Sequence, residues 1–263
     1  MVILVYHYFS KEKAGWLTCT VTELESHLRY LERSAHVLSL REGLQTLEQG
    51  RKVPRRSVAI AVDDADTSFY NLAWPIFKQH RIPVFCSLVT GHLGGKMNIG
   101  GDIQLASLKQ LEEMVASGLI EFGSHSSTHP HFNQVAAEHV RSELSSSKEI
   151  VAALQGFCDI FCYPYGNVSV VTGDTERHLS ELGYQYALTT CSGRVKRGMD
   201  RLRIGRTNVT RSMRAWHLPF YSNGFVSALI HGRKVLRGER FYSRHSPGGL
   251  IGDGRVLEQS ARK

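Results

Sequence analysis

The sequence predicts an α/β domain in which helices wrap a parallel sheet or barrel. Segments typical of strands and helices alternate along the chain, as they do in βαβ units. The length of 263 residues and the hydrophobic content of 42% suit one domain of barrel size. Polar motifs follow directly after predicted strands, where the chemistry of such folds is usually found. No apolar run is long enough to span a membrane as a helix.

The first half of the chain begins with an apolar run at residues 2–6 (VILVY), which predicts a buried strand. Residues 20–34 predict an amphipathic helix, with leucines spaced along one face and a capping-box pattern at Thr20 and Glu23. Further elements expected in this half are strands at 36–40, 57–62 and 82–89, a helix at 68–80 and a glycine-rich loop at 91–101.

The second half continues the alternation and uses glycine to end helices. Gly118 and Gly183 each follow a helix-like segment, as expected where a helix ends in a left-handed residue. The expected elements are helices at 105–117, 134–155 and 172–182 and strands at 119–124, 158–163 and 184–190.

Asp63 and Asp64 stand side by side at the end of the strand at 57–62. Adjacent carboxylates repel each other unless a cation lies between them or one of them is held elsewhere. A divalent metal ion would satisfy this requirement. The alternative is an Asp pair in a turn that caps the following helix.

His125 and His129 are four residues apart in the segment GSHSSTHPHF. The preceding strand and the Gly, Ser and Pro content favour a loop or a single turn, which can also bring two imidazoles together. Because the chain contains 13 histidines, such a pair also arises by chance. His131 either extends the cluster or packs beside it.

Two imidazoles and one carboxylate leave coordination positions free for water and substrate, as catalytic metal sites do. A second carboxylate next to that ligand is placed to deprotonate water whose pKa the metal lowers. Cys158 and Cys162 also have the spacing of a ligand pair. No second Cys or His pair at zinc-finger spacing accompanies them, so we interpret them as buried thiols on one strand.

Three motifs in this order resemble those of the polysaccharide deacetylases, the NodB-homology group or carbohydrate esterase family 4. VAIAVDDAD is similar to the family's first motif, GSHSSTHP to its metal-binding motif and FCYPYG to its third. The strand ending in Tyr6-His7 resembles the poly-N-acetylglucosamine deacetylase branch. The resemblance covers roughly residues 2–210 and implies a distorted (β/α) barrel.

The resemblance also implies a metal-binding set and a base. Asp64, His125 and His129 would bind one divalent metal ion, and Asp63 would be the general base for the water that the metal activates. Zinc is favoured, while cobalt, nickel and iron accept the same ligands.

Further roles follow from the same resemblance. The backbone N–H of Tyr165 would stabilise the oxyanion, and His7 would protonate the departing amine. The alternative for His7 is a core histidine at a strand end. Tyr163 and Arg206 are candidate substrate-binding residues. Arg206 would otherwise orient Asp63 or lie on the surface.

The chain departs from the family pattern around these motifs. Ala61 and Ala65 replace the family's Thr and Gly beside the Asp pair, and Cys162 replaces an Arg found in many members. If the family's Gly has a positive φ, Ala65 would be strained. We therefore expect metal binding to be retained and leave the rate and the exact substrate open.

The net charge of +8 is unevenly distributed along the chain. Residues 192–263 hold 16 of the 32 Lys and Arg residues but only 4 of the 24 Asp and Glu residues. This basic third suggests an anionic partner, such as a phosphate-bearing sugar or an anionic lipid surface. No nucleic-acid motif is present, so we expect no nucleic-acid partner.

We divide the chain into a catalytic domain at 1–230 and a basic tail at 231–263, which we expect to be poorly ordered unless it docks on a partner. The aromatic-rich stretch at 215–230 is flanked by cations and would suit a peripheral membrane contact. We favour the other interpretation, in which it forms a final core helix that closes the barrel.

Five scattered cysteines argue against a disulfide framework and for reduced thiols. The segment MVILVYHYFSKEK has no basic region before its apolar run and no small-residue cleavage site, so we expect no signal peptide. Both features predict a cytoplasmic location, peripheral to the inner face of the membrane if the basic third contacts lipid.

The expected reaction is hydrolysis of an N-acetyl group on an amino sugar during assembly of lipopolysaccharide or another surface polysaccharide. The substrate would be an N-acetylated sugar linked to a nucleotide or a lipid. Two rival hypotheses stay open. One is hydrolysis of an O-acetyl group or another amide on the same fold, and the other is a carbohydrate-binding or scaffold protein that has lost turnover.

Overall fold

A computed structural model describes residues 1–12, 15–99, 101–218 and 220 of the chain. The central sheet runs in the order β12-β11-β10-β9-β6-β5-β1-β13, and each of these pairings is parallel. Its strands are β1 (Val2–Tyr6), β5 (Ser57–Val62), β6 (Val84–Leu88), β9 (Ile120–Ser124), β10 (Ile160–Cys162), β11 (Tyr186–Thr189), β12 (Ile204–Gly205) and β13 (Thr207–Asn208).

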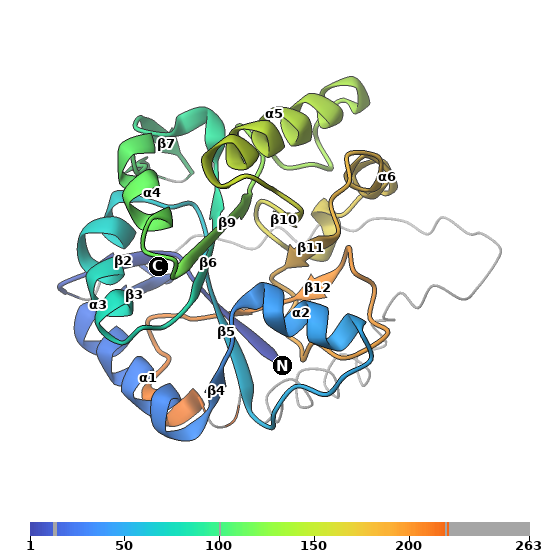
Figure 1. Ribbon diagram of the computed structural model, residues 1–263. Coiled ribbons are helices and arrows are strands. Elements are labelled where there is room, and N and C mark those ends of the chain that lie inside the picture. The colour runs from blue at the N-terminus through green and yellow to red at the C-terminus, as the bar shows by residue number, and fades with distance from the viewer. Residues whose placement is uncertain (13–14, 100, 219, 221–263) are drawn as a thin grey trace, which may run out of the picture.

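One short segment of chain nearly closes this sheet into a barrel. β12 and β13 are separated only by Arg206, yet β12 pairs with β11 and β13 pairs with β1. The segment therefore joins the two ends of the sheet, as Figure 1 shows from one side of the molecule. The predicted distorted (β/α) barrel is confirmed.

Smaller strands are attached to the barrel. β4 (His36–Val37) pairs with the amino end of β5. β2 (Tyr8–Ser10) follows β1 and pairs in parallel with β3 (Thr18–Thr20). β7 (Lys96–Asn98) and β8 (Asp102–Gln104) pair antiparallel.

The helices lie around the outside of the strands in Figure 1. They are α1 (Val21–Ser34), α2 (Leu40–Glu48), α3 (Trp74–Gln79), α4 (Leu108–Val115), α5 (Ala137–Gln155) and α6 (Gly173–Glu181). A π-helical turn at Phe69–Ala73 leads into α3, and short 3₁₀ turns lie at Thr90–His92, Val168–Val170 and Ala215–His217.

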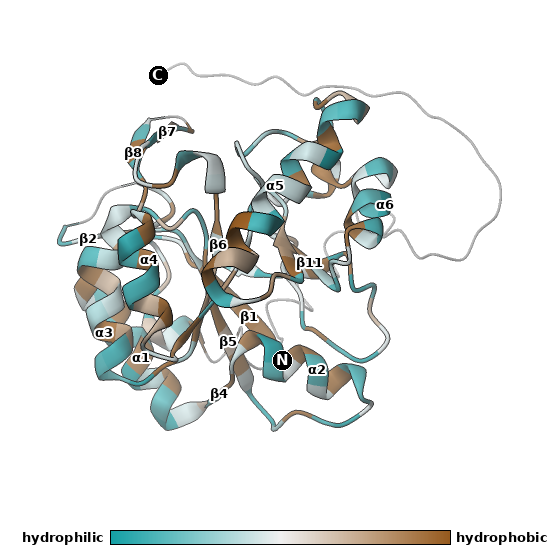
Figure 2. Ribbon diagram, turned by 45° about the horizontal axis from the view of Figure 1, so that its top comes forward, coloured by the Kyte–Doolittle hydropathy of each residue, from teal (hydrophilic) through white to brown (hydrophobic). Residues whose placement is uncertain are grey.

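The barrel strands bury side chains on both faces, as parallel strands covered by helices do. In β1, Ile3 and Val5 belong to an inner cluster, whereas Leu4 and Tyr6 belong to the layer beneath the helices. The strands are accordingly hydrophobic along most of their length in Figure 2. The inner cluster contains Met1, Ile3, Val5, Ala59, Ala61, Phe85, Ile160, Cys162, Tyr186, Leu188 and Ile204, with Leu40 and Leu44 of α2 and Val195.

At the carboxyl ends of the strands, the positions that face into the barrel hold polar residues. Two residues beyond an inward position, the next side chain again points inward. Val5 is thus followed by His7, Ala61 by Asp63, Phe85 by Ser87 and Gly123 by His125. The fold therefore gathers these polar groups at one end of the barrel.

The expected order of elements is confirmed for most of the chain, including the capping box in which Thr20 accepts from the Glu23 backbone N–H. Two regions differ. The strand expected at 36–40 stops at Val37, because the Ser39 side chain caps α2 and Leu40 begins that helix. The glycine-rich loop expected at 91–101 contains β7, which pairs with β8 just beyond it.

At the carboxyl-terminal end, the sequence predicts a core helix or a membrane contact at 215–230 and a tail at 231–263. Of these, the structure describes the turn at Ala215–His217, Leu218 and residue 220, and the tail lies outside the described residues. Among the described helices, none combines the length and apolar character that crossing a membrane requires.

Candidate metal centre

Asp64, His125 and His129 meet at the carboxyl end of the barrel. Each offers one ligand atom, and these atoms all lie within 4.8 Å of one another. The Asp64 Oδ1 atom is 3.6 Å from Nε2 of His125 and 3.7 Å from Nε2 of His129. All three side chains are buried, with exposed fractions of 1%, 2% and 7%.

Asp64 reaches the imidazoles because the chain turns sharply after β5. Asp63 continues the strand alternation, but Asp64 and Ala65 have φ values of 71° and 57°. This left-handed conformation costs a residue with a Cβ atom roughly 1–2 kcal/mol. The positive φ anticipated at Ala65 is therefore present, and the fully buried Ala65 occupies it. The turn aims the two neighbouring carboxylates in different directions.

His125 is fixed by the strand next to it. Its Nδ1 atom lies 2.7 Å from the carbonyl oxygen of Cys162, so Nδ1–H donates there and Nε2 is left free toward Asp64. Burial lowers the pKa of both His125 and His129 to about 4. Both imidazoles are therefore neutral at pH 7, which is the form that binds metal.

The loop that carries His129 is held from α5. Glu143 accepts hydrogen bonds from the backbone N–H groups of Ser127 and Thr128, both at 2.9 Å, and from the Thr128 hydroxyl at 2.7 Å. The His129 N–H donates to Ser126 Oγ at 3.0 Å. Glu143 was not among the predicted site residues. Its only signal in the sequence is an acidic residue near the start of the long helix that follows the loop.

This set of residues fits a divalent metal ion. Asp64 Oδ1 is buried and has no hydrogen-bond partner among the described residues, although it faces two neutral imidazoles. An unpaired buried carboxylate oxygen costs several kcal/mol unless a cation satisfies it. Ligand atoms about 2.0–2.1 Å from a tetrahedral zinc ion lie roughly 3.3 Å apart. The distances of 3.6 and 3.7 Å from Asp64 Oδ1 to the two imidazole nitrogens are close to that value.

Asp63 points into the barrel and is held by a buried arginine. Arg206 donates from both terminal nitrogens to the two carboxylate oxygens at 2.6 and 2.8 Å, and the Ser87 hydroxyl donates at 2.6 Å. Burial alone would raise the pKa of Asp63, but Arg206, together with His125 and His7, holds it well below its usual range. Asp63 is therefore ionised at neutral pH.

Arg206 itself has an exposed fraction of 0%. It is neither a surface residue nor open to a sugar, so the substrate-binding assignment of its side chain is corrected. Of the expectations for Arg206, only the orientation of Asp63 agrees with its position.

Tyr163 does not lie where a substrate-binding role would require it. Its side chain is fully buried in the layer beneath the helices, where its ring packs edge-on against Phe161 at 5.2 Å. Tyr163 follows β10 at an outward position, one residue beyond the inward Cys162. The assignment is corrected because of this alternation.

Tyr165 lies at the rim of the centre. Its φ of 60° turns the chain, and its side chain is 42% exposed. The ring lies 4.7 Å from that of His129 and stacks on His131 at 3.5 Å, so His131 packs beside the cluster. Among the described residues, none accepts a hydrogen bond from the Tyr165 N–H.

His7 also lies in the centre, although its role was open between a core and a site residue. Its Nε2 atom is 3.7 Å from Asp63 Oδ2, and the side chain keeps 12% exposure. The Nδ1 atom is buried and without a partner among the described residues.

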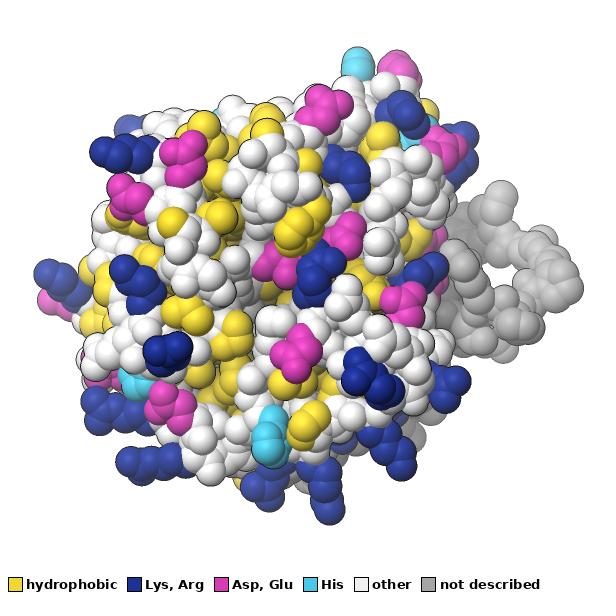
Figure 3. Space-filling model, viewed as in Figure 1, with side chains coloured by type: hydrophobic (Ala, Val, Ile, Leu, Met, Phe, Trp, Pro, Cys, Tyr) yellow, Lys and Arg dark blue, Asp and Glu magenta, His cyan; other side chains and the backbone are white. Residues whose placement is uncertain are grey.

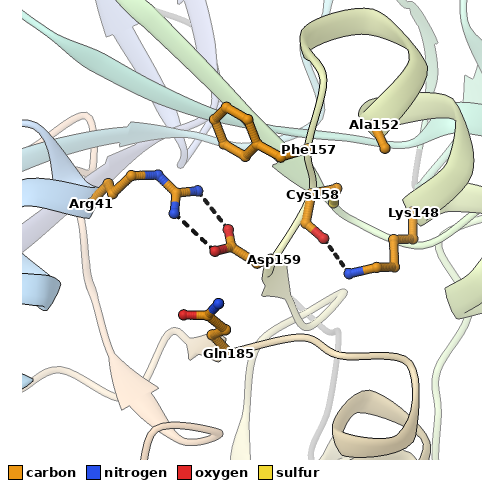
Figure 4. Close-up of a pocket in the computed structure, with 7 residues that line it drawn as sticks. All are labelled: Arg41, Lys148, Ala152, Phe157, Cys158, Asp159 and Gln185. Atoms are coloured by element: carbon orange, nitrogen blue, oxygen red, sulfur yellow. Dashed lines mark hydrogen bonds and ion pairs between the residues drawn. The ribbon is translucent and has the colours of Figure 1, made fainter.

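A hollow of about 520 Å³ lies near the amino ends of β9 and β10, away from these residues. Figure 4 shows Arg41 in it, paired with Asp159 at 2.5 Å, and Lys148 directed at the Cys158 carbonyl. Arg41 also pairs with Glu121 at 2.6 Å. Because these charges already satisfy one another, the hollow is not a rival centre.

The chain matches the family model described as polysaccharide deacetylase over residues 50–187. It is 30% identical over 211 residues to a poly-beta-1,6-N-acetyl-D-glucosamine N-deacetylase of Staphylococcus epidermidis, covering 76% of this chain and 71% of that protein. A protein of the same description from Staphylococcus aureus is 33% identical over 146 residues, which is 55% of this chain and 48% of that protein.

Solved structures show the same fold. The Streptococcus pyogenes deacetylase PplD in complex with acetate has a TM-score of 0.73 at 22% identity, over 84% of this chain and 97% of that one. IcaB from Ammonifex degensii has a TM-score of 0.69 at 23% identity, over 84% and 96%. With the matched family model, the sequence relatives and the shared barrel, this chain belongs to the polysaccharide deacetylase family.

Proposed function

We propose that this protein is a metal-dependent N-deacetylase that hydrolyses the N-acetyl group of an amino sugar in a surface polysaccharide, releasing acetate and a free amine. One observation carries the proposal. Two adjacent carboxylates have separate environments, Asp63 with Arg206 and Asp64 with two imidazoles. Relatives with 30–33% identity, described as poly-beta-1,6-N-acetyl-D-glucosamine N-deacetylases, support the substrate class.

Asp64, His125 and His129 would hold the cation. When bound, a divalent metal supplies Lewis acidity and lowers the pKa of water. Zinc is the first choice, since two imidazoles and a carboxylate are frequent zinc ligands, and cobalt, nickel and iron remain alternatives.

The protein's own groups divide the proton transfers between them. Asp63, held ionised by Arg206, accepts a proton from the attacking water while the water oxygen bonds to the acetyl carbon. The free N–H of Tyr165 donates to the carbonyl oxygen as negative charge develops on it. His7 gives a proton to the nitrogen as the C–N bond breaks, so acetate and amine leave. His7 Nε2 lies 3.7 Å from Asp63 Oδ2, so the proton that Asp63 takes from the water can pass to His7 and from there to the nitrogen.

The half-exposed ring of Tyr165 supplies the surface for the sugar beside the centre. An aromatic face at the rim packs well against the apolar face of a pyranose. We extend the proposal to the pathway: the reaction would belong to the biosynthesis of lipopolysaccharide or another surface glycan. A nucleotide-linked or lipid-linked substrate remains part of this proposal.

The basic third of the chain is proposed to contact an anionic membrane surface rather than the phosphates of the substrate. In its described part, the Arg197 guanidinium carbon lies 3.3 Å from the position that a Cβ atom on Gly50 would take. The basic loops at 49–56 and 194–201 therefore adjoin. Lys and Arg gather along the lower rim of the face in Figure 3. The exposed cations of the loops at 49–56 and 194–201 are Arg51, Lys52, Arg55, Arg56, Lys196, Arg197 and Arg201.

These loops lie at the opposite end of the barrel from the metal ligands. The loop at 49–56 leads into the amino end of β5, and Arg194 pairs with Val2 at the start of β1. A strand of five or six residues spans roughly 17–20 Å, which is too far for a phosphate next to a sugar in the centre.

The five cysteines are all free thiols, which supports a reducing compartment such as the cytoplasm.

Vesicle sedimentation tests the membrane contact. The double variant Lys196→Glu/Arg197→Glu should lose much of its binding to phosphatidylglycerol vesicles, whereas Lys109→Glu/Arg177→Glu, at exposed positions on other faces, should bind like the wild type. Equal binding by both double variants would refute the proposed surface.

Acetate release from N-acetylated and O-acetylated glucosamine oligomers, measured side by side, tests the reaction. We expect release from the N-acetylated oligomer, and an Asp63→Asn variant should lose at least a hundredfold in rate. Asp174→Asn, an exposed change on α6, is the matched control. Preference for the O-acetylated oligomer would favour the esterase rival, and a wild type without turnover would favour the scaffold.

A further inference from the structure

The two carboxylate oxygens of Asp64 have different surroundings. Oδ1 faces the Nε2 atoms of His125 and His129 and has no hydrogen-bond partner among the described residues. Oδ2 accepts a hydrogen bond of 2.9 Å from the hydroxyl of Tyr8. One oxygen is therefore available to a cation, while a phenol occupies the other.

We infer that Tyr8 is a positioning residue that keeps Asp64 a one-oxygen ligand of the metal. The inference rests on the proposed metal-dependent function. A carboxylate can bind a metal through one oxygen or through both. With Oδ2 committed to Tyr8, Asp64 fills one coordination position, and positions stay open for water and the acetyl oxygen. Outer partners of this kind orient the ligands and tune metal affinity.

The phenol is well placed for this role because its strand is anchored on both sides. Tyr8 begins β2, and its backbone N–H donates to the Leu17 carbonyl at 3.4 Å. The next residue, Phe9, donates its N–H to Ser68 Oγ at 2.8 Å, at the start of the helical segment that follows the Asp pair. The loop bearing Asp64 is thus tied to β2 through Phe9 as well as through Tyr8.

The packing of Phe9 adds rigidity to that link. Its ring is buried and lies 5.9 Å from Tyr6 and 6.1 Å from Phe69. Because the neighbouring residue is locked in the core, the Tyr8 hydroxyl has little freedom to leave Asp64. A held donor keeps the carboxylate in one orientation before the metal arrives.

Tyr6 offers a matched control two residues away. Its hydroxyl is also buried and hydrogen-bonded, at 3.2 Å to Nδ1 of His27. His27 in turn contacts the Met213 carbonyl, so this pair lies in the outer layer and away from the metal ligands. Tyr6→Phe and Tyr8→Phe each remove one hydroxyl and keep the ring.

The experiment uses the full chain, treated with chelator and then titrated with Zn²⁺ or Co²⁺ against a chromophoric chelator. Tyr8→Phe should weaken metal binding roughly 10- to 100-fold. Its Co²⁺ visible spectrum should also change, because Asp64 can then bind through both oxygens. Tyr6→Phe should bind within about twofold of the wild type with an unchanged spectrum, and melting temperatures check that each variant folds.

The outcomes separate this inference from the proposed function. Wild-type affinity together with a wild-type Co²⁺ spectrum in Tyr8→Phe would overturn the role of Tyr8 and leave the metal site standing. A wild type that binds neither metal, or an Asp64→Asn variant that binds both as the wild type does, would instead refute the metal site. Equal loss in Tyr6→Phe and Tyr8→Phe would assign the effect to general packing and also overturn the inference.

Discussion

Replacing Arg206 by methionine should destabilise the protein strongly, because it leaves Asp63 buried without a counter-charge. The two side chains have exposed fractions of 0% and 2% and share two hydrogen bonds of 2.6 and 2.8 Å. Charges about 4 Å apart interact by about 4 kcal/mol at an effective dielectric constant of 20. Removing one partner of a buried pair typically costs roughly 3–5 kcal/mol.

Urea unfolding of the metal-free protein at pH 7 measures this cost, and a double-mutant cycle isolates the pair. Arg206→Met should lose roughly 3–5 kcal/mol of unfolding free energy, and adding Asp63→Asn should restore part of it, because a neutral amide is cheaper to bury than an anion. A loss below about 1 kcal/mol, or a double variant whose cost equals that of the two single changes combined, would refute the reasoning.

The same pair makes stability depend on pH. Asp63 has a pKa well below its usual range in the folded wild type, so its contribution is present above the unfolded value of about 3.9 and is lost as the pH falls toward the folded pKa. In Arg206→Met, the largest influence that opposes burial is gone, so the pKa of Asp63 rises. The stability gap between wild type and variant should therefore widen between pH 4 and pH 7, which unfolding curves across that window check.

Three further changes have distinct expected results. His7→Gln should lower kcat by about 10²- to 10⁴-fold and leave Zn²⁺ affinity unchanged, since His7 acts on the leaving nitrogen; an unchanged kcat would remove its acid role. Gly123→Ala should cost about 1–3 kcal/mol in unfolding free energy, because the new Cβ would lie 2.3 Å from the Phe85 ring; wild-type stability would contradict this packing. Glu143→Ala should weaken Zn²⁺ binding by loosening the His129 loop, as measured by chelator competition, and Glu149→Ala, farther along α5, is the control.

Much of the barrel could be predicted because its strands and helices carry local signals. Apolar runs such as that of β5 and the Thr20 capping box need no distant partner to be recognised. The error at 36–40 arose where a β-branched and apolar stretch competed with a capping side chain. Ser39 accepts from the Glu42 N–H, and this local hydrogen bond turns the chain into α2.

The candidate ligands could also be anticipated, because paired Asp and His residues at strand ends suggest a metal wherever the strands are parallel. The residues that hold the site in place were anticipated only in part. Orientation of Asp63 was one of several expectations for Arg206, which lies 143 positions away in the sequence, and no pattern pointed to Tyr8, which meets Asp64 across 56 positions. Such contacts depend on barrel closure and on the hydrogen bonds that hold β2 in place. The sequence alone does not give the distances between the residues that they bring together.

The outward position of Tyr163 shows that a motif alone does not determine which way each of its side chains points. A motif places Tyr163 and Tyr165 near the centre, but strand alternation turns one side chain under the helices and the turn after it exposes the other. One residue of register therefore decides which tyrosine a sugar can touch.

Metal-dependent acetate release tests the central claim most directly. Chelator-treated wild type, given increasing Zn²⁺ or Co²⁺ and an N-acetylglucosamine oligomer, should regain activity up to one metal ion per chain, and Asp64→Ala should stay inactive at every metal concentration. Full activity in the chelator-treated protein without added metal, or recovery in Asp64→Ala equal to the wild type, would contradict the account.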